Sequence, residues 1–281
     1  MPIKEEINNA PEVHYEYLNA TGKIKYNMTN DYMFRIVLQK DKNTLINLIS
    51  SVLDIPVEII KDVQIQNPIE PGDSIDDKEY QLDILVLLNN NTFINLEMQV
   101  VNYENWPERS LSYLCRRFDN VARGQEYSSV KPVYHIGFLD YTLFEEHPDF
   151  FAKYQVRNAE DGFLYTDKFN LYVVELNNID KATAYDKRLG IDSWAKLFKA
   201  RTWEEIKMIV DENPSMNSTA ESIYMSNADF IIQEKCRARE DAIAHERFQQ
   251  RKLAEQNEKI QSLSDEVTRL SKLLDENGIK H

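Results

Sequence analysis

Two acidic residues and a glutamine are the side chains of this chain best placed to do chemistry together. Asp83 and Glu97 lie fourteen positions apart in a stretch typical of a β-hairpin, and Gln99 follows Glu97 by two positions. If the turn spans Asn89 to Asn91, Asp83 faces Glu97, with Cβ atoms about 4.5 to 5.5 Å apart. Two carboxylates at that distance repel each other unless a proton or a cation lies between them. Mg²⁺ takes oxygen ligands of this kind.

Such a pair suits the hydrolysis of a phosphodiester bond. A metal held by Asp83 and Glu97 would polarise the phosphate, lower the pKa of a bound water and stabilise the leaving oxygen. The backbone carbonyl of Met98 could be a further ligand, and Gln99 could orient the water by hydrogen bonding. Surface strands often carry acids. The hairpin alone is therefore also compatible with a pair of acids that binds no ion.

The apolar residues of the hairpin predict which way the acids point. Side chains alternate between the two faces of a strand. One face is apolar throughout and should pack on the core; it carries Leu82, Ile84, Val86, Leu88, Ile94, Leu96, Met98 and Val100. Asp83, Glu97 and Gln99 then share the other face. The acids would oppose each other there, with no Lys or Arg opposite them.

The segments around the hairpin predict a layered α/β fold. Apolar stripes indicate helices from Thr29 and over 42–53, and Pro107 can open a long helix over 108–126. The almost continuously apolar segment 133–139 predicts a strand buried on both faces. Strand, helix and strand in that order form a βαβ unit, so this strand should run parallel to the one carrying Glu97. Together with a further strand within 163–176, these elements predict one mixed sheet flanked by helices.

The C-terminal third is predicted to be helical. Residues 189–235 show repeating apolar faces, and a heptad pattern follows from about residue 240. The heptad seam contains Leu253, Gln256, Ile260, Leu263, Val267, Leu270 and Leu274. Its apolar spacing predicts a coiled coil that joins two or more chains through residues 250–276. The alternative is a single amphipathic helix that packs back on its own domain.

The composition limits the class of protein. A chain of 281 residues with 42% hydrophobic side chains can form one large domain or two small ones. It has no run of about 18 apolar residues, so we expect no membrane partner. The N-terminus lacks the apolar core of a signal peptide. Cys115 and Cys236 lie far apart and are expected to be free thiols in a cytoplasmic protein.

The net charge argues against a broad nucleic-acid surface. At pH 7 the chain carries a formal charge of −14, whereas polyphosphate binding favours a basic surface. Arg109, Arg116, Arg117 and Arg123, all in the helix predicted after the hairpin, could form a local basic patch. The same arginines could equally be a solvated helix face.

The order of five sequence blocks resembles a known nuclease family. The blocks are TNDYMFRIVL from Thr29, QLDI, NLEMQV, RSLSYLCRRFDNVARGQEY from Arg109, and KPVYHIGFLD. Together they are similar to the bacterial PD-(D/E)XK nuclease family of transposases and recombination-promoting nucleases. The resemblance covers roughly residues 27–180. Glu97-Met98-Gln99 is similar to the Glu-x-Gln variant of the Glu-x-Lys motif.

The resemblance implies a restriction-endonuclease-like fold and cleavage of DNA with Mg²⁺, or with Mn²⁺ in its place. Carried over by position, Asp83 and Glu97 are metal ligands and Gln99 takes the place of the family's lysine. The chain departs from the motif in having Leu82 before Asp83 and no lysine after Glu97; Lys78 could supply that charge from the preceding strand. We expect four parts: an arm over 1–25, the nuclease-like domain over 26–180, a helical extension over 181–240 and the coiled coil over 241–281.

Other polar residues are secondary candidates. Asp31 could be a further acidic ligand or a charge at a helix start. Arg109 and Tyr113, one turn apart, could contact the scissile phosphate. His135 is expected to be a core residue, and Glu175 could be either structural or near the site. The histidine spacing predicts no zinc site, and no phosphate-binding glycine motif is present. A nuclease-fold module without activity, which binds nucleic acid or protein through its coiled coil, is the competing interpretation.

Overall fold

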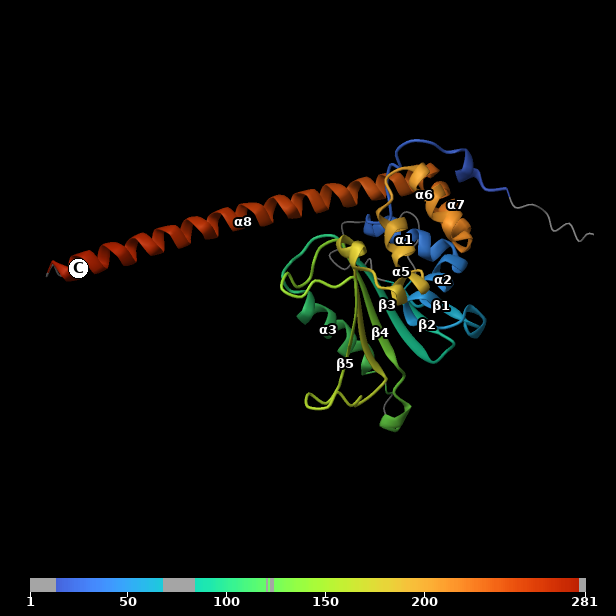
Figure 1. Cartoon of the computed structure of the whole chain (residues 1–281), viewed down its shortest axis with the longest axis horizontal. Helices are drawn as coiled ribbons and strands as arrows, with labels where there is room; N and C mark the ends of the chain where they lie inside the picture. The colour runs from blue at the N-terminus through green and yellow to red at the C-terminus, as the bar shows by residue number, and fades with distance from the viewer. Residues whose placement is uncertain (1–13, 68–83, 120, 122–123, 278–281) are drawn as a thin grey trace, which may run out of the picture. The chain divides into compact units, whose positions relative to one another are not determined.

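The computed structural model describes residues 14–67, 84–119, 121 and 124–277. Within them, six strands form one mixed sheet in the order β1-β2-β3-β4-β6-β5. The strands are β1 (Val63–Ile65), β2 (Ile84–Leu88), β3 (Thr92–Gln99), β4 (Val133–Leu139), β5 (Phe151–Gln155) and β6 (Phe169–Glu175). Helices cover both faces of this sheet (Figure 1). The mixed sheet with flanking helices is the fold class that the sequence predicts.

The hairpin β2–β3 has the predicted register over its described length. Leu88 pairs with Thr92, and Ile84 pairs with Leu96. Asn89 and Asn90 have φ angles of 49° and 53°, which the short polar side chain of asparagine tolerates. This turn fixes which side chains of β3 share a face. Asp83 and Lys78 lie outside the described residues.

The βαβ unit is also observed. Helix α3 (Trp106–Phe118) connects β3 to β4, and these strands are parallel, as are β4 and β6. Helix α3 begins one residue before Pro107 and ends at Phe118, well short of residue 126, where the sequence predicts its end. Strand β5, which pairs antiparallel with β6, was not predicted. Strand β6 occupies only the second half of the segment 163–176.

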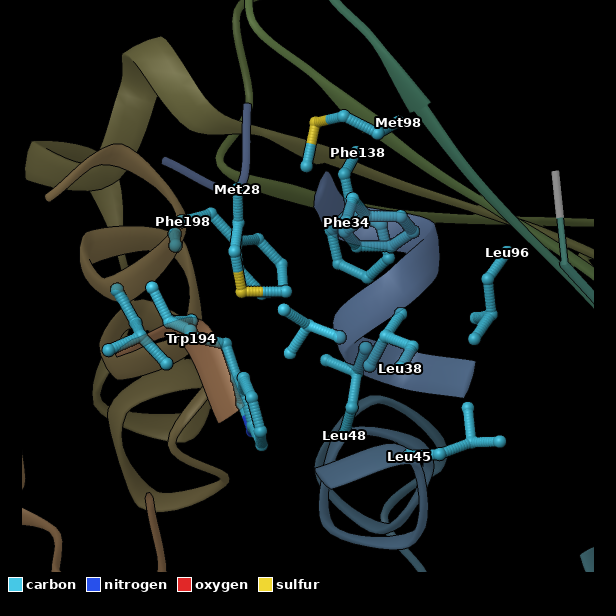
Figure 2. Close-up of a cluster of buried hydrophobic side chains, with 14 of the residues drawn as sticks. Met28, Phe34, Leu38, Leu45, Leu48, Leu96, Met98, Phe138, Trp194 and Phe198 are labelled. Carbon is cyan, nitrogen blue, oxygen red and sulfur yellow. The ribbon is translucent and has the colours of Figure 1, made fainter. Parts of the chain in front are cut away.

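One face of the sheet packs on most of the helices. These are α1 (Asp31–Lys40), α2 (Lys42–Leu53), α4 (Ala184–Arg188), α5 (Ile191–Lys199), α6 (Trp203–Glu212) and α7 (Asn217–Ala228). Short 3-10 helices join them: η1 (Glu16–Asn19), η2 (Val57–Ile59), η4 (Leu176–Lys181) and η5 (Pro214–Met216). Figure 2 shows this core, in which Phe34 and Phe198 meet edge to face with ring centroids 5.5 Å apart. Asn30 caps α1, its side chain accepting a hydrogen bond from the Met33 amide.

The other face of the sheet is covered by α3. A smaller apolar cluster lies between them, made of Trp106, Leu114, Val133, Leu139, Leu171 and Val173. Alternation along the strands sends Ile94, Leu96 and Met98 into the large core and leaves Glu97 on the side of α3. The acid is therefore in the thinner of the two helical layers. The 3-10 helix η3 (Tyr127–Ser129) follows α3.

The chain divides into two compact units, Met1–Cys236 and Arg237–His281. Helix α8 (Phe230–Glu276) supplies the described part of the second unit. Its heptad residues Leu253, Ile260, Leu263, Val267 and Leu270 are exposed, with between 47% and 64% of their surface accessible. No described helix is both long enough and apolar enough to span a bilayer.

Candidate active site

Glu97 is the buried centre of the candidate site. It lies near the end of β3 with 4% of its surface exposed. Its neighbour Met98 points to the opposite face, toward Phe138 and Phe34 (Figure 2), so only the backbone of Met98 can serve the site. Gln99 is half-buried, and its side-chain amide donates a 2.9 Å hydrogen bond to the carbonyl of Val101. This bond orients the glutamine at the end of the strand.

Arg109 holds one oxygen of Glu97. The distance from its Nη2 atom to Glu97 Oε1 is 2.6 Å, and its guanidinium lies 5.7 Å from the ring centroid of Tyr113, one turn further along α3. Arg109 and Tyr113, both predicted site residues, are therefore brought to Glu97. The expectation that no cationic side chain opposes the acids was wrong for Glu97. The expectation considered only the two strands of the hairpin, whereas the cation comes from helix α3, which packs directly on this face of the sheet.

The second oxygen of Glu97 faces a histidine that sequence reasoning placed in the core. The Nε2 atom of His135, on β4, lies 3.6 Å from Glu97 Oε2, and its Nδ1 atom lies 3.1 Å from the side-chain nitrogen of Asn95. His135 is fully buried as expected. Burial, together with the positive charge of Arg109, lowers the pKa of His135 to about 3. The ring is therefore neutral at physiological pH.

A glycine makes room for this arrangement. Gly137 pairs directly with Glu97 across β3 and β4. The indole of Trp106 lies close to it, and a Cβ atom at position 137 would come within 2.6 Å of the Trp106 Cη2 atom. Trp106 and Tyr113 also flank the His135 ring, with centroid distances of 5.5 and 6.1 Å. The close approach of α3 to the sheet thus depends on the missing side chain at 137.

A second buried acid lies on the same face, two strands away. Glu175 ends β6, is 4% exposed and accepts a hydrogen bond from the Asn178 amide. Burial raises its pKa. Burial also raises the pKa of Tyr141, with a further contribution from the negative charge of Glu97, so the tyrosine hydroxyl stays protonated and within the field of the acid. Side chains alternate between faces along β6, so Glu175 shares a face with Phe169. This alternation is the sequence signal that could have placed Glu175 on this face.

Three other predicted residues lie in the end turns of helices. Asp31 is 5% exposed in the first turn of α1, where a negative charge suits the helix dipole. Arg116 and Arg117 are exposed in the last turn of α3. Arg123, Asp83 and Lys78 lie outside the described residues. The structure therefore gathers Glu97, Arg109 and Tyr113, and adds Asn95 and His135.

Comparison with known proteins assigns the chain to a family. The sequence family described as PD-(D/E)XK nuclease family transposase matches residues 28–246. The chain belongs to this family. The mixed six-stranded sheet with flanking helices is consistent with its α/β nuclease fold. No curated protein and no solved structure matches the chain.

Members of the PD-(D/E)XK nuclease fold generally use divalent metal ions. Over the described ranges, no group of three or more His, Cys, Asp or Glu side chains could hold one. The carboxylate of Glu97 has Arg109 on one oxygen. Mg²⁺ is commonly held by only one or two carboxylates plus water and substrate phosphates. A buried glutamate therefore fits a cation of this kind in its donor chemistry, provided that the cation replaces the guanidinium.

Proposed function

We propose that this member of the PD-(D/E)XK nuclease family is a metal-dependent DNA endonuclease that acts in recombination or in the movement of a mobile element. The observation that supports the proposal best is Glu97, a buried carboxylate near the end of a central strand, with one oxygen paired to a partly exposed arginine. A carboxylate in that setting attracts cations strongly, because the surrounding protein screens its charge poorly. The family match supports a nuclease as the class of protein.

In this proposal Asp83 and Glu97 hold Mg²⁺, or Mn²⁺ in its place, with the backbone carbonyl of Met98 as a further ligand. The bound cation supplies Lewis acidity to the phosphate and lowers the pKa of a water molecule. Gln99, held by Val101 through its amide, keeps its carbonyl oxygen as an acceptor for a proton of that water. Lys78 would supply the positive charge that the residue at position 99 lacks.

In this proposal Arg109 pairs with Glu97 before the cation binds and with a phosphate of the substrate afterwards. In the structure it neutralises Glu97. When a cation takes that carboxylate oxygen, the guanidinium becomes available to a phosphate oxygen, for which its planar fork of donors is suited. Its side chain is 35% exposed, so it can reach substrate without unfolding α3. Tyr113 supports the guanidinium from the same helix, and Asp31 in the first turn of α1 remains a candidate acid.

DNA is the proposed partner, although the chain is acidic overall. Positive charge on α3 is concentrated at Arg109, Arg116 and Arg117. A small number of phosphate contacts gives weak affinity that falls with salt. The cytoplasm is the proposed location, in keeping with the free thiols of Cys115 and Cys236.

A homodimer through residues 250–276 would supply two active sites, one for each DNA strand. The exposed heptad residues of α8, from Leu253 to Leu270, provide the apolar seam that such a dimer would bury. β-Branched residues at Ile260 and Val267, with leucine at 263 and 270, are the pattern that favours a two-stranded parallel coiled coil.

One observation favours a second candidate function. The ion pair between Glu97 and Arg109 satisfies the acid without a metal, and no lysine stands at position 99. Both features suit a nuclease fold that has lost activity and that binds nucleic acid or a partner protein.

Cleavage of supercoiled plasmid separates the two functions. Wild type, Asp83→Ala and Glu97→Gln are compared in Mg²⁺ and in EDTA, with Glu108→Gln, an exposed acid on α3, as the matched control. The nuclease proposal expects Mg²⁺-dependent nicks from wild type and the control, and none from the two site variants. Absence of cleavage by wild type, or equal cleavage by all four proteins, would leave the binding module as the better account.

A further inference from the structure

We propose that His135 is a positioning residue for Glu97: Asn95 fixes its ring in the Nε2–H tautomer, and that N–H group faces Glu97 Oε2. The role in orienting a metal ligand rests on the proposed nuclease function. The geometry of the three side chains does not, because it follows from their contacts with one another.

The tautomer follows from the donor that Asn95 presents. The atom of Asn95 next to His135 Nδ1 is the amide nitrogen, at 3.1 Å. With the amide in this orientation its nitrogen donates, so Nδ1 accepts and carries no proton. In a neutral ring the proton then belongs to Nε2. The opposite tautomer would set a lone pair of Nε2 against a carboxylate oxygen 3.6 Å away, which is electrostatically unfavourable.

The ring has no freedom to leave this orientation. His135 is fully buried. The ring of Tyr113 stacks on one side, with planes 10° apart, and the indole of Trp106 lies tilted against it at 5.5 Å. Both aromatic residues belong to α3, the helix that carries Arg109. One helix therefore fixes the imidazole and also supplies the cation that pairs with Glu97.

The two oxygens of Glu97 are thereby made different. Oε1 is paired with Arg109, whose side chain is 35% exposed, while Oε2 faces an imidazole that is sealed in the core. A cation from solvent would meet Oε1 and would replace the partly exposed guanidinium. Meanwhile His135 keeps Oε2 from turning outward. In metal sites, partners that orient a ligand in this way typically affect affinity by 10- to 100-fold.

Three variants test the positioning role. His135→Phe keeps an aromatic ring between Trp106 and Tyr113 but removes the N–H group. His135→Gln retains a donor at the place of Nε2. Asn95→Leu removes the hydrogen bond that selects the tautomer. His147→Phe, at an exposed histidine, is the control for loss of a histidine.

Nitrogen NMR of the histidine rings and carbon NMR of the Glu97 carboxyl group provide readouts that need no metal. We expect Nε2–H for His135 in wild type, a mixture of tautomers in Asn95→Leu, and a shifted Glu97 carboxyl signal in His135→Phe that returns toward the wild-type position in His135→Gln. Nδ1–H in the wild type, or an unchanged Glu97 signal in His135→Phe, would overturn the proposal. If His135→Phe does not fold, the ring-nitrogen signals and the Glu97 carboxyl signal of Asn95→Leu and His135→Gln test the positioning role instead.

Mn²⁺ affinity completes the test. His135→Phe should bind Mn²⁺ about 10-fold more weakly than wild type, and His135→Gln close to wild type. Equal affinity in wild type and His135→Phe would contradict the positioning role. If wild type binds no Mn²⁺, the nuclease proposal fails, whereas the NMR signals still decide whether His135 positions Glu97.

Discussion

Arg109 and Glu97 form a 2.6 Å ion pair that ties helix α3 to the central strand β3. The glutamate is almost fully buried and the arginine is partly exposed. Removing only one partner of a buried pair leaves an uncompensated charge and is strongly destabilising. A divalent cation avoids that penalty, because it replaces the guanidinium with another positive charge. The pair therefore marks the place at which we expect metal and arginine to exchange.

The exchange predicts opposite effects on binding and cleavage when Arg109 is neutralised. In Arg109→Met, Mn²⁺ no longer competes with a guanidinium, so the affinity measured by calorimetry should equal or exceed that of wild type. Plasmid cleavage should fall, on the order of 100-fold, because the charge that meets the phosphate is lost. Arg109→Lys is the control that retains the charge. Its cleavage rate should lie between those of wild type and Arg109→Met. A parallel loss of binding and cleavage in Arg109→Met would argue against exchange.

Gly137 and Trp106 predict a stability effect. The methyl group of Gly137→Ala would run into the indole, and such overpacking costs roughly 1–3 kcal/mol in the free energy of unfolding. Urea denaturation measures the loss. In a Trp106→Phe background the smaller ring leaves space, so the same alanine should cost less, a coupling typical of residues in contact. Additive costs in the double variant would show that the indole is not the obstacle.

The buried imidazole predicts a pH dependence of stability. The pKa of His135 is lowered from 6.5 to about 3, so between these values the unfolded chain binds a proton that the folded chain excludes. The contribution of His135 to the free energy of unfolding is therefore complete above pH 6.5 and is lost as the pH falls toward 3. Its limiting slope is about 1.4 kcal/mol per pH unit. Urea denaturation of wild type and His135→Gln from pH 7 to pH 4 should show the shallower slope in the variant; identical slopes would contradict the assignment.

The heptad seam predicts an association that one charge can weaken. Leu263 is 58% exposed on α8, and in a coiled coil it would lie between two chains. Leu263→Lys should therefore shift sedimentation from dimer toward monomer. Ser262→Lys, one residue earlier and off the seam, should sediment as wild type does. If both variants keep the mass of the wild-type protein, or if the wild type is itself a monomer, residues 250–276 do not dimerise the chain.

The sequence predicted the parts of the fold that depend on local pattern. Helix α2 over Lys42–Leu53 and strand β4 over Val133–Leu139 coincide with their apolar periodicity. The asparagine turn fixed the register of β2 and β3. Strand β5 was not predicted, because all of its residues are exposed or half-buried and the segment lacks an alternating pattern.

The candidate site was predicted less completely, because its contacts are tertiary. Glu97 follows from the hairpin, but its partners come from α3 and β4. The side of α3 that faces the sheet is set by Trp106 packing on Gly137, which no local pattern reveals. The sequence predicts an ordinary core residue at His135, because its polar role depends on Asn95, its register partner across the parallel strands. Register between β3 and β4 was the missing information.

Direct titration with Mn²⁺ tests the central claim most closely. Calorimetry on wild type, Asp83→Ala, Glu97→Gln and the exposed-acid control Glu108→Gln asks whether the two hairpin acids hold a cation. We predict saturable binding by wild type and Glu108→Gln, with loss of that binding in Asp83→Ala and in Glu97→Gln. Binding of equal affinity in Glu97→Gln, or none in the wild-type protein, would contradict it.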